Sequence, residues 1–281
     1  MTTKIEWCQE TWNPITGCSK ISEGCRNCYA ERMAKRLAGR YGYPADDPFR
    51  VTFHPDRIEQ PLKWKKPRRI FVCSMGDLFH GDVCQAWLAD IFDVIERCPQ
   101  HKFLLLTKRP YIMAKRLLDP IAQMLPLHFH SKTNEPLKNV WLGTTVENND
   151  YLWRITHLLS IPAAVRFVSI EPMLGPVRID YSKMFPTDAC FQKPPMLDWV
   201  IVGGESGPGA RQMRPDWVRS VRDDCVNAGI PFFFKQWGSN PDKSAFDEPY
   251  GMVCARNELP KYGRMIDGRT WDGYPDPTEG E

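Results

Sequence analysis

The sequence lacks the long apolar runs, the strong net charge and the internal repeats that mark specialised classes of protein. No stretch approaches the roughly 18 apolar residues of a membrane span, and the opening MTTKIEWCQE lacks the apolar core of a signal peptide. With 37 basic and 34 acidic residues, the net charge of +3 does not by itself indicate a nucleic-acid partner. We therefore expect a globular cytoplasmic protein that has no membrane partner.

The sequence has no second C-x-x-C pair, and its ten cysteines do not indicate a disulfide framework in a compartment that keeps thiols reduced. Seven of them are scattered singly, at Cys8, Cys73, Cys84, Cys98, Cys190, Cys225 and Cys254. The other three, Cys18, Cys25 and Cys28, lie together in the spacing C-x6-C-x2-C. This group is the one with ligand-like spacing.

Short apolar runs alternate with helical patterns, as expected of parallel strands covered on both faces. The runs are RIFVCSM (69–75), FLLLT (103–107), NVWLGTT (139–145), VRFVSIE (165–171), DWVIVGGE (198–205) and IPFFFKQW (230–237). Helical patterns cover 83–98, 151–160 and 215–229, and the last one ends at Gly229 as a helix should. The alternation predicts an α/β fold, a partial parallel (β/α) barrel of about six strands with loop insertions.

We expect the barrel to span residues 1–238 and a C-terminal extension, 239–281, to pack on it, because the tail is polar and weakly patterned. Two roles are open to Asp267, Arg269 and Trp271 in this extension. They could close over the active site or cap the bottom of the barrel, and we prefer capping.

Most runs finish in charged or hydroxylic residues, and parallel barrels place their chemistry at the carboxyl ends of their strands. Reading each run to its end gives, with the glycines between them, Ser74, Gly76, Asp77, Thr107, Lys108, Arg109, Thr144, Thr145, Glu147, Ser169, Glu171, Gly203, Gly204, Glu205, Ser206, Lys235 and Gln236. Any one of them could be a helix cap or a surface ion pair. Together they predict a lined pocket.

Three thiolates are one fewer than the irons of a [4Fe–4S] cluster, so such a cluster would keep one iron open. The open iron can bind the amino and carboxylate groups of S-adenosylmethionine. An electron from the cluster then cleaves the sulfonium and releases a 5′-deoxyadenosyl radical. A cluster held by three thiolates is therefore suited to radical chemistry.

The stretch TWNPITGCSKISEGCRNCYAERMAKR resembles a phage-associated three-cysteine family classed with the radical S-adenosylmethionine proteins. The similarity continues through IFVCSMGDLFH, LLTKRP, LGTTVEN, FVSIEPMLG, VIVGGESGPGAR and FFFKQWG, covers most of residues 4–240, and reaches GRMIDGRTWDGYP. The commonest radical motif, C-x3-C-x2-C, has three residues fewer between its first two cysteines. The resemblance implies a partial TIM barrel with one cluster, in the cytoplasm of a bacterium or of a phage-infected host cell.

The resemblance also implies roles for particular residues. Cys18, Cys25 and Cys28 would bind the cluster, and Tyr29 would pack beside the cluster or the adenine. Asp77, in the turn SMGD, would receive the amino group of S-adenosylmethionine, with Ser74 and Gly76 allowing close backbone approach. Thr145, Glu147, Ser169 and Glu171 would contact the ribose hydroxyls and the methionine carboxylate.

The remaining expected site residues face the adenine or the substrate. Gly203 and Gly204 would allow close approach, although a tight strand-to-helix turn is the alternative explanation of this GGESGPGAR segment. Lys108, Glu147, Glu205 and Lys235 are the catalytic candidates, Lys108 as a contact for carboxylate or phosphate.

The expected substrate is a nucleobase, a nucleotide or DNA, for example an amino-acid-modified thymine that is rearranged in phage DNA hypermodification. Cationic and aromatic residues expected around the barrel mouth suit an anionic, planar substrate; they are Lys63, Trp64, Lys65, Lys66, Arg68, Arg109, Arg211, Lys235 and Trp237. The electron donor would be a flavodoxin or a ferredoxin. Isomerase, lyase and transferase chemistry all stay open.

Two other interpretations stay open. The first is a radical enzyme that acts on a peptide or small metabolite; the widely spaced Cys190, Cys225 and Cys254 predict a single cluster even then. The second is a zinc-stabilised nucleic-acid-binding protein, with His54 or His80 as fourth ligand and KWKKPRR (63–69) contacting phosphates. The x6 spacing is wider than the two to four residues typical of a zinc site.

Overall fold

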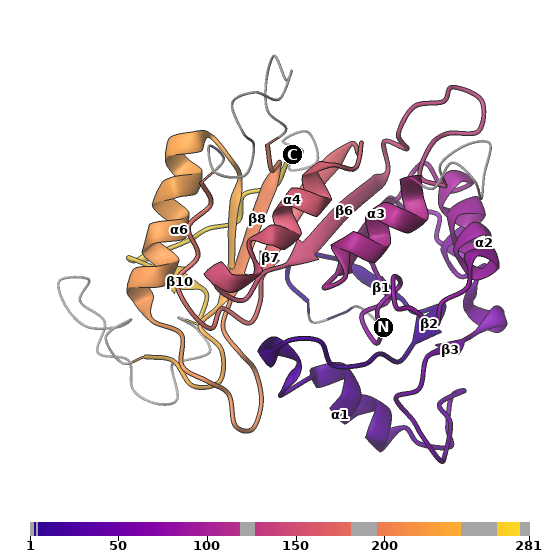
Figure 1. Cartoon of the computed structure of the whole chain (residues 1–281), viewed down its shortest axis with the longest axis horizontal. Coiled ribbons are helices and arrows are strands. Elements are labelled where there is room, and N and C mark those ends of the chain that lie inside the picture. The colour runs from indigo at the N-terminus through magenta and orange to yellow at the C-terminus, as the bar shows by residue number, and fades with distance from the viewer. Residues whose placement is uncertain (1–2, 4, 119–126, 181–195, 243–262, 276–281) are drawn as a thin grey trace. The chain divides into compact units, whose positions relative to one another are not determined.

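The computed structural model describes residue 3 and residues 5–118, 127–180, 196–242 and 263–275 (Figure 1). The chain forms two compact units. Unit 1 contains Met1–Thr144 and His157–Arg166, and unit 2 contains Thr145–Thr156 and Phe167–Glu281. The expected boundary at residue 238 lies inside unit 2, and much of the expected extension falls outside the described residues.

The main sheet has seven described strands in the order β1-β4-β5-β6-β7-β8-β9. They are β1 (Glu10–Trp12), β4 (Arg69–Val72), β5 (Lys102–Thr107), β6 (Val140–Thr145), β7 (Val165–Ile170), β8 (Trp199–Gly203) and β9 (Phe232–Gln236). The α/β class and the parallel sheet are confirmed, and an open order from β1 to β9 is compatible with a partial barrel. The expected strand number of about six was wrong, because the three residues of β1 are too few to form an apolar run.

The described α-helices are α1 (Tyr29–Arg36), α2 (Gln85–Glu96), α3 (Pro110–Leu118), α4 (Trp153–Leu159) and α6 (Pro215–Ala228). The described 3-10 helices are η1 (Glu23–Cys25), η2 (Pro55–Arg57), η3 (Pro61–Lys63) and η4 (Asn149–Tyr151). The helical patterns at 83–98, 151–160 and 215–229 are confirmed. Gly229 adopts φ 67°, the left-handed conformation that ends α6 without a Cβ clash.

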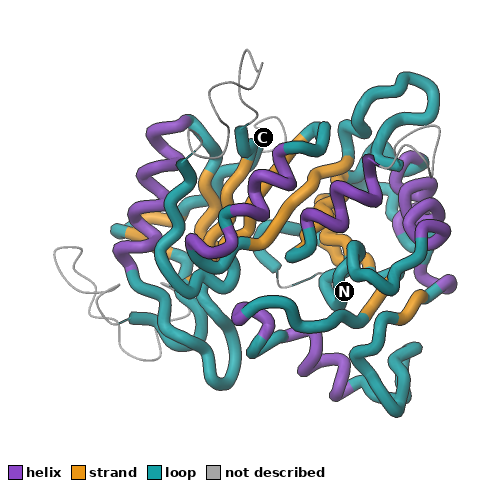
Figure 2. The backbone as a smooth tube through the Cα atoms, viewed as in Figure 1, coloured by secondary structure: helices purple, strands orange, loops and turns teal. Residues whose placement is uncertain are grey.

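Burial of the central strands explains their apolar composition. All six residues of β6 and all five of β8 are buried, as expected of strands covered on both faces. Long loops connect these elements (Figure 2), and the cysteines lie in the region between β1 and β4. It contains one short antiparallel pair, β2 (Ile15–Thr16) with β3 (Thr52–Phe53).

Gly17 fixes the start of the cysteine loop. It follows β2, donates its N–H to the Met75 carbonyl at 2.9 Å and forms a parallel bridge with Gly76. Its φ is 89°, and a Cβ at this position would lie 2.2 Å from the Arg50 carbonyl oxygen. Only glycine fits this crossing of two backbone segments without strain.

Gly17→Ala is therefore expected to lower the free energy of unfolding by about 1–3 kcal/mol, through a strained φ and a backbone clash. Urea unfolding measures the change. The matched control is Gly81→Ala, where a Cβ would meet nothing within 4 Å, and we expect it to change stability by less than about 0.5 kcal/mol. Equal effects of the two substitutions would contradict this account.

In unit 2, the segment 263–275 packs on the edge of β9. Phe234 donates its N–H to the Trp271 carbonyl, and Gly273 donates to the Phe232 carbonyl. The segment forms a short hairpin of β10 (Met265–Ile266) and β11 (Arg269–Thr270). Asp267, in its turn, accepts hydrogen bonds from Arg219 and Arg222 of α6. The described part of the expected extension therefore packs on β9 and α6.

Candidate functional site

The three cysteines of the motif lie on one loop of unit 1. Cys25 is the last residue of η1, and Cys28 immediately precedes α1 and accepts a hydrogen bond from the N–H of Arg32. All three thiols are free and partly exposed. The local chain thus brings three free, partly exposed thiols into eleven residues.

Arg109, which follows β5, contacts this loop through both terminal nitrogens of its guanidinium, Nη1 and Nη2. Nη1 donates to the Cys18 Sγ at 3.2 Å and to the Asp77 Oδ2 at 2.8 Å. Nη2 donates to the Ser19 carbonyl at 2.8 Å and to the Ser19 hydroxyl at 3.0 Å. The side chains of Arg109 and Asp77 are only 8% and 7% exposed, so this ion pair is a buried one.

Asp77 has partners on both carboxylate oxygens. Besides the Arg109 contact, its Oδ1 accepts from the Thr107 hydroxyl at 2.7 Å and from the Phe79 N–H at 3.0 Å. Thr107 Oγ1 in turn accepts from the Arg109 N–H at 2.9 Å. The sequence indicated an acidic group that receives a ligand; the structure shows a carboxylate that orients an arginine.

The turn after β4 lies against the cysteine loop. Ser74 donates its hydroxyl to the Asn13 side-chain oxygen at 3.2 Å. A Cβ on Gly76 would lie 2.8 Å from the Gly17 oxygen. Gly76 therefore does allow a close backbone approach, and the neighbour that approaches is the cysteine loop.

The electrostatic surroundings of the thiols differ. Burial and the negative charge of Asp77 raise the pKa of Cys18 to about 11, although Arg109 acts in the opposite direction. Burial also opposes ionisation of Cys25, but hydrogen bonds from Ile21 and Ser22 and the positive charge of Lys108 outweigh it and lower the pKa of that thiol. Lys108, an expected site residue, thus acts on the cysteine loop.

The histidines considered as zinc ligands have other partners. His54 Nε2 lies 2.8 Å from the Thr16 hydroxyl, and His80 Nε2 lies 2.7 Å from the Ser19 hydroxyl. His80 Nδ1 accepts from the Asp82 N–H at 3.2 Å. Within the described part of the chain, no three His, Cys, Asp or Glu side chains are placed to hold a single metal ion.

His54 makes the stability of unit 1 dependent on pH. Burial, together with the charge of Arg57, lowers the pKa of His54 from 6.5 to about 4. Between these values the unfolded chain binds a proton that the folded chain does not, so the free energy of unfolding should fall as pH drops from 6.5 toward 4. Burial lowers the pKa of His128 to about 4 in the same way.

We expect His54→Gln to reduce the proton uptake on unfolding by up to one proton in this acidic window. Urea unfolding at a series of pH values measures it. Between pH about 7 and 8 the substitution should not change the slope of the free energy of unfolding against pH, because the histidine is neutral in the folded and unfolded states. If His54→Gln and wild type had the same slope of unfolding free energy against pH below pH about 6, the prediction would be wrong.

In unit 2 the structure brings four expected residues together. Glu171 Oε2 accepts from the Ser169 hydroxyl at 3.1 Å, and its Oε1 lies 2.9 Å from the Lys235 ammonium. That Oε1 atom is buried and receives no aligned hydrogen bond. A Cβ on Gly203 would lie 2.5 Å from Glu171 Oε1, so glycine makes room for the carboxylate.

Thr145, the last residue of β6, and Glu147, just after that strand, belong to a buried group. Glu147 is fully buried, and its Oε2 accepts from Arg154 Nη1 at 2.8 Å. The same guanidinium donates to the Thr145 carbonyl at 2.9 Å. The sequence predicted these residues for ligand contact, whereas the structure shows them holding α4 to the end of β6.

The glycine-rich segment after β8 is braced by the segment after β9. Arg211 holds Glu205 through its backbone N–H to Oε2 at 2.8 Å, Nε to Oε2 at 3.0 Å and Nη2 to Oε1 at 2.6 Å. A Cβ on Gly204 would lie 2.1 Å from the Trp237 carbonyl oxygen. The backbone that approaches Gly204 closely is therefore that of Trp237 and Gly238.

Two arginine roles were missed at the level of sequence. Arg109 was assigned to a pocket mouth, and its contact with Cys18 was not foreseen. Arg154 was not singled out, although it lies four residues before the buried Leu158 in an apolar helical pattern. A charged residue on such a face indicates a buried partner.

The basic segment KWKKPRR precedes β4, so it lies at the amino end of that strand. The cysteine loop lies at the other end, where Gly17 bridges to Gly76. Residues 63–69 were expected beside the pocket mouth; the direction of β4 places them at the opposite end of the strand. Arg68 there pairs with Glu10 and lies over the Trp64 ring.

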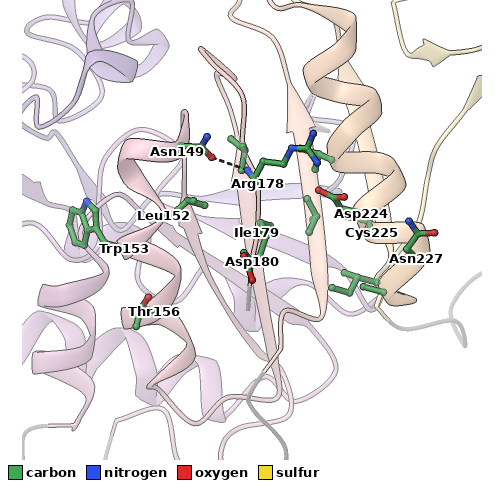
Figure 3. A pocket seen from close by; sticks show the side chains of 15 residues that line it. Asn149, Leu152, Trp153, Thr156, Arg178, Ile179, Asp180, Asp224, Cys225 and Asn227 are labelled. Atoms are coloured by element: carbon green, nitrogen blue, oxygen red, sulfur yellow. Dashed lines mark hydrogen bonds between the residues drawn. The ribbon is translucent and has the colours of Figure 1, made fainter. Parts of the chain in front are cut away.

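A pocket of about 970 Å³ lies within unit 2, built by η4, α4, residues 177–180 and α6 (Figure 3). Asn149, Trp153, Arg178 and Asp224 are among the residues that line it. Asn149 Oδ1 accepts from the Arg178 N–H at 2.9 Å. None of the expected site residues lines this pocket.

Among the described residues, no helix combines the length and hydrophobicity that crossing a membrane requires. Searches of curated proteins and of solved structures returned no match. Residues 2–275 match the family model described as a protein of unknown function, DUF5131, and because this match spans most of the sequence, the chain belongs to that family.

Proposed function

We propose that this protein is a radical S-adenosylmethionine enzyme that acts on a nucleobase-containing substrate. One observation carries the proposal. Three reduced, partly exposed cysteines lie on one loop at the carboxyl end of the first strands, next to the cations Lys108 and Arg109. Cations beside thiols stabilise the ionised sulfur that iron requires.

The donor set fits a [4Fe–4S] cluster. Such a cluster takes each thiolate on a separate iron, so its ligands stand around a cube and need not converge on a single ion. Cys18 and Cys25 still lie near enough that the charge of one thiolate raises the pKa of the other. Cys28 lies on the same loop, at the start of α1.

When bound, a reduced cluster supplies an electron to S-adenosylmethionine, whose cleavage gives methionine and a 5′-deoxyadenosyl radical. The chain's own groups would bind and orient. Within unit 2, Ser169, Glu171 and Lys235 form a hydroxyl, carboxylate and ammonium group whose chemistry suits hydroxyl and carboxylate functions of a ligand. Tyr29, 61% exposed beside Cys28, offers a ring for stacking.

The nucleic-acid part of the proposal rests on a basic surface around α1. Residues 18–41 contain six basic and two acidic residues, a net charge of +4, whereas the whole chain carries +3. Arg26, Arg36 and Arg40 are exposed there. The rings of Tyr29 and Tyr41 are 61% and 76% exposed. Exposed cations with exposed aromatic rings suit phosphates and unpaired bases.

The double variant Arg36→Ala/Arg40→Ala is expected to weaken binding of a single-stranded oligonucleotide roughly tenfold at moderate salt and to reduce the salt slope by about 1 to 2. Fluorescence anisotropy at several salt concentrations measures both quantities. The control is Lys65→Ala/Lys66→Ala, which removes two charges at the amino end of β4. A loss of affinity in the control alone would place the docking surface at residues 63–69 instead.

The enzyme class is tested by anaerobic purification, reconstitution with iron and sulfide, and reduction with dithionite in the presence of S-adenosylmethionine. We expect about four irons per chain, a brown chromophore and 5′-deoxyadenosine. Stoichiometric zinc without a chromophore would overturn the proposal. Turnover of peptides with no oligonucleotide binding would retain the radical class and replace the substrate.

A further inference from the structure

Resting on the proposed function, we propose that Asp77 and Arg109 are positioning residues that hold Cys18 for the cluster, and that the Arg109 guanidinium raises the reduction potential of the bound cluster. Asp77 acts through Arg109, and Arg109 acts on the sulfur. Arg109 and Asp77 form a buried ion pair beside the cysteine loop, and positioning of Cys18 gives this pair a role. Arginine is a pure donor, and its contact with the Cys18 sulfur would strengthen if that sulfur became an iron-bound thiolate.

The Arg109 guanidinium makes four contacts. They reach two neighbouring residues, Cys18 and Ser19, and the carboxylate of Asp77. Nη1 contacts Cys18 Sγ at 3.2 Å and Asp77 Oδ2 at 2.8 Å, and Nη2 contacts the Ser19 carbonyl and hydroxyl at 2.8 and 3.0 Å. The planar fork therefore fixes both the backbone at Ser19 and the sulfur beside it. Lysine, a point charge on a flexible stem, cannot reproduce these contacts together.

Several hydrogen bonds together fix the position of Arg109. Asp77 Oδ2 accepts from the guanidinium, while Thr107 Oγ1 donates to Asp77 Oδ1 and accepts from the Arg109 N–H. The Phe79 N–H also donates to Oδ1. This arrangement holds the arginine in one orientation, as residues around a metal ligand commonly do.

The expected electronic effect follows from charge. Reduction adds an electron to a cluster, and a hydrogen bond or positive charge at a cysteine sulfur stabilises the more negative state. Removal of the Arg109 guanidinium should therefore lower the reduction potential. It should also loosen Cys18, so that iron leaves the cluster faster.

The test compares Arg109→Gln and Arg109→Lys with wild type in the full-length protein, after anaerobic reconstitution. Iron release to a chelator gives the rate of cluster loss, and an EPR-monitored redox titration gives the midpoint potential. We expect Arg109→Gln to lose iron about tenfold faster, the scale of one charge-assisted hydrogen bond, and to have a lower potential. Arg109→Lys keeps the charge, so its rate of iron loss and its midpoint potential should lie between those of wild type and Arg109→Gln.

Two further variants separate positioning from a general loss of structure. Arg68→Gln removes an arginine–carboxylate pair, with Glu10, at the other end of β4 and should match wild type in both readouts. Asp77→Asn should add little to Arg109→Gln, so that the double variant loses iron within about twofold of the single variant. Thermal unfolding of each metal-free variant reports whether it folds.

The outcomes are distinct. Faster iron loss and a lower potential in Arg109→Gln, with Arg68→Gln unchanged, would support the proposal. Full iron binding in wild type, with Arg109→Gln unchanged in both rate and potential, would overturn the positioning role and leave the enzyme class standing. Wild-type protein that binds no iron would overturn both.

Discussion

Replacing Cys25 by Ala should reduce bound iron from about four per chain to less than one and abolish 5′-deoxyadenosine formation. In the proposed function three thiolates anchor the cluster, so the two that remain should not retain it. Iron analysis and the absorbance of the reconstituted protein measure the first effect. Chromatography after dithionite reduction measures the second. Cys18→Ala and Cys28→Ala should behave alike.

Cys84→Ala is the matched control, since Cys84 is an exposed, free thiol at the start of α2 in the same unit. It should retain wild-type iron and product. If Cys25→Ala kept its full iron content, the three-cysteine loop would not be the cluster site. If Cys84→Ala lost iron to the same extent, adventitious thiol binding would explain the metal.

Arg154→Met should lower the free energy of unfolding by about 3–5 kcal/mol, the largest stability effect we expect. Glu147 is 0% and Arg154 1% exposed at the side chain, and they meet at 2.8 Å. Removing the guanidinium takes the Arg154 charge away from a fully buried carboxylate and removes the Arg154 hydrogen bond to the Thr145 carbonyl. Urea unfolding measures the loss.

Two variants sharpen this prediction. Arg97→Met removes a comparable arginine from an exposed pair with Asp93, at 53% and 62% exposure, and should cost less than about 1 kcal/mol. Glu147→Gln/Arg154→Met removes both charges and should recover part of the loss. Similar costs for Arg154→Met and Arg97→Met would show that the buried pair contributes no more than a surface pair.

The central strands could be predicted from sequence because their burial on both faces leaves an apolar run. β5, β6, β7, β8 and β9 all lie within one or two residues of the predicted ranges. β1 could not be predicted in this way. Its three residues, Glu10–Trp12, become a strand by pairing with β4, a contact that no local pattern records.

The candidate site, too, could be predicted only in part from the sequence. Ligand spacing is local, so the sequence by itself determined that Cys18, Cys25 and Cys28 form one group, and the structure describes them on one loop. Carboxylates at strand ends were equally visible, but their roles were not. Asp77 and Glu147 look alike in the sequence, and each proves to be paired with an arginine brought to it by the fold.

The sequence by itself determined the α/β class, most strands and the three-cysteine loop, because hydrophobic periodicity and ligand spacing are properties of neighbouring residues. Only the tertiary structure decided which charges are neutralised inside the protein. Arg109 lies 91 residues from the sulfur it contacts, and the basic segment 63–69 lies at the amino end of β4 because that strand runs from Arg69 to Val72. Pairing of buried charges depends on through-space distance, which strand order and direction set and local sequence does not.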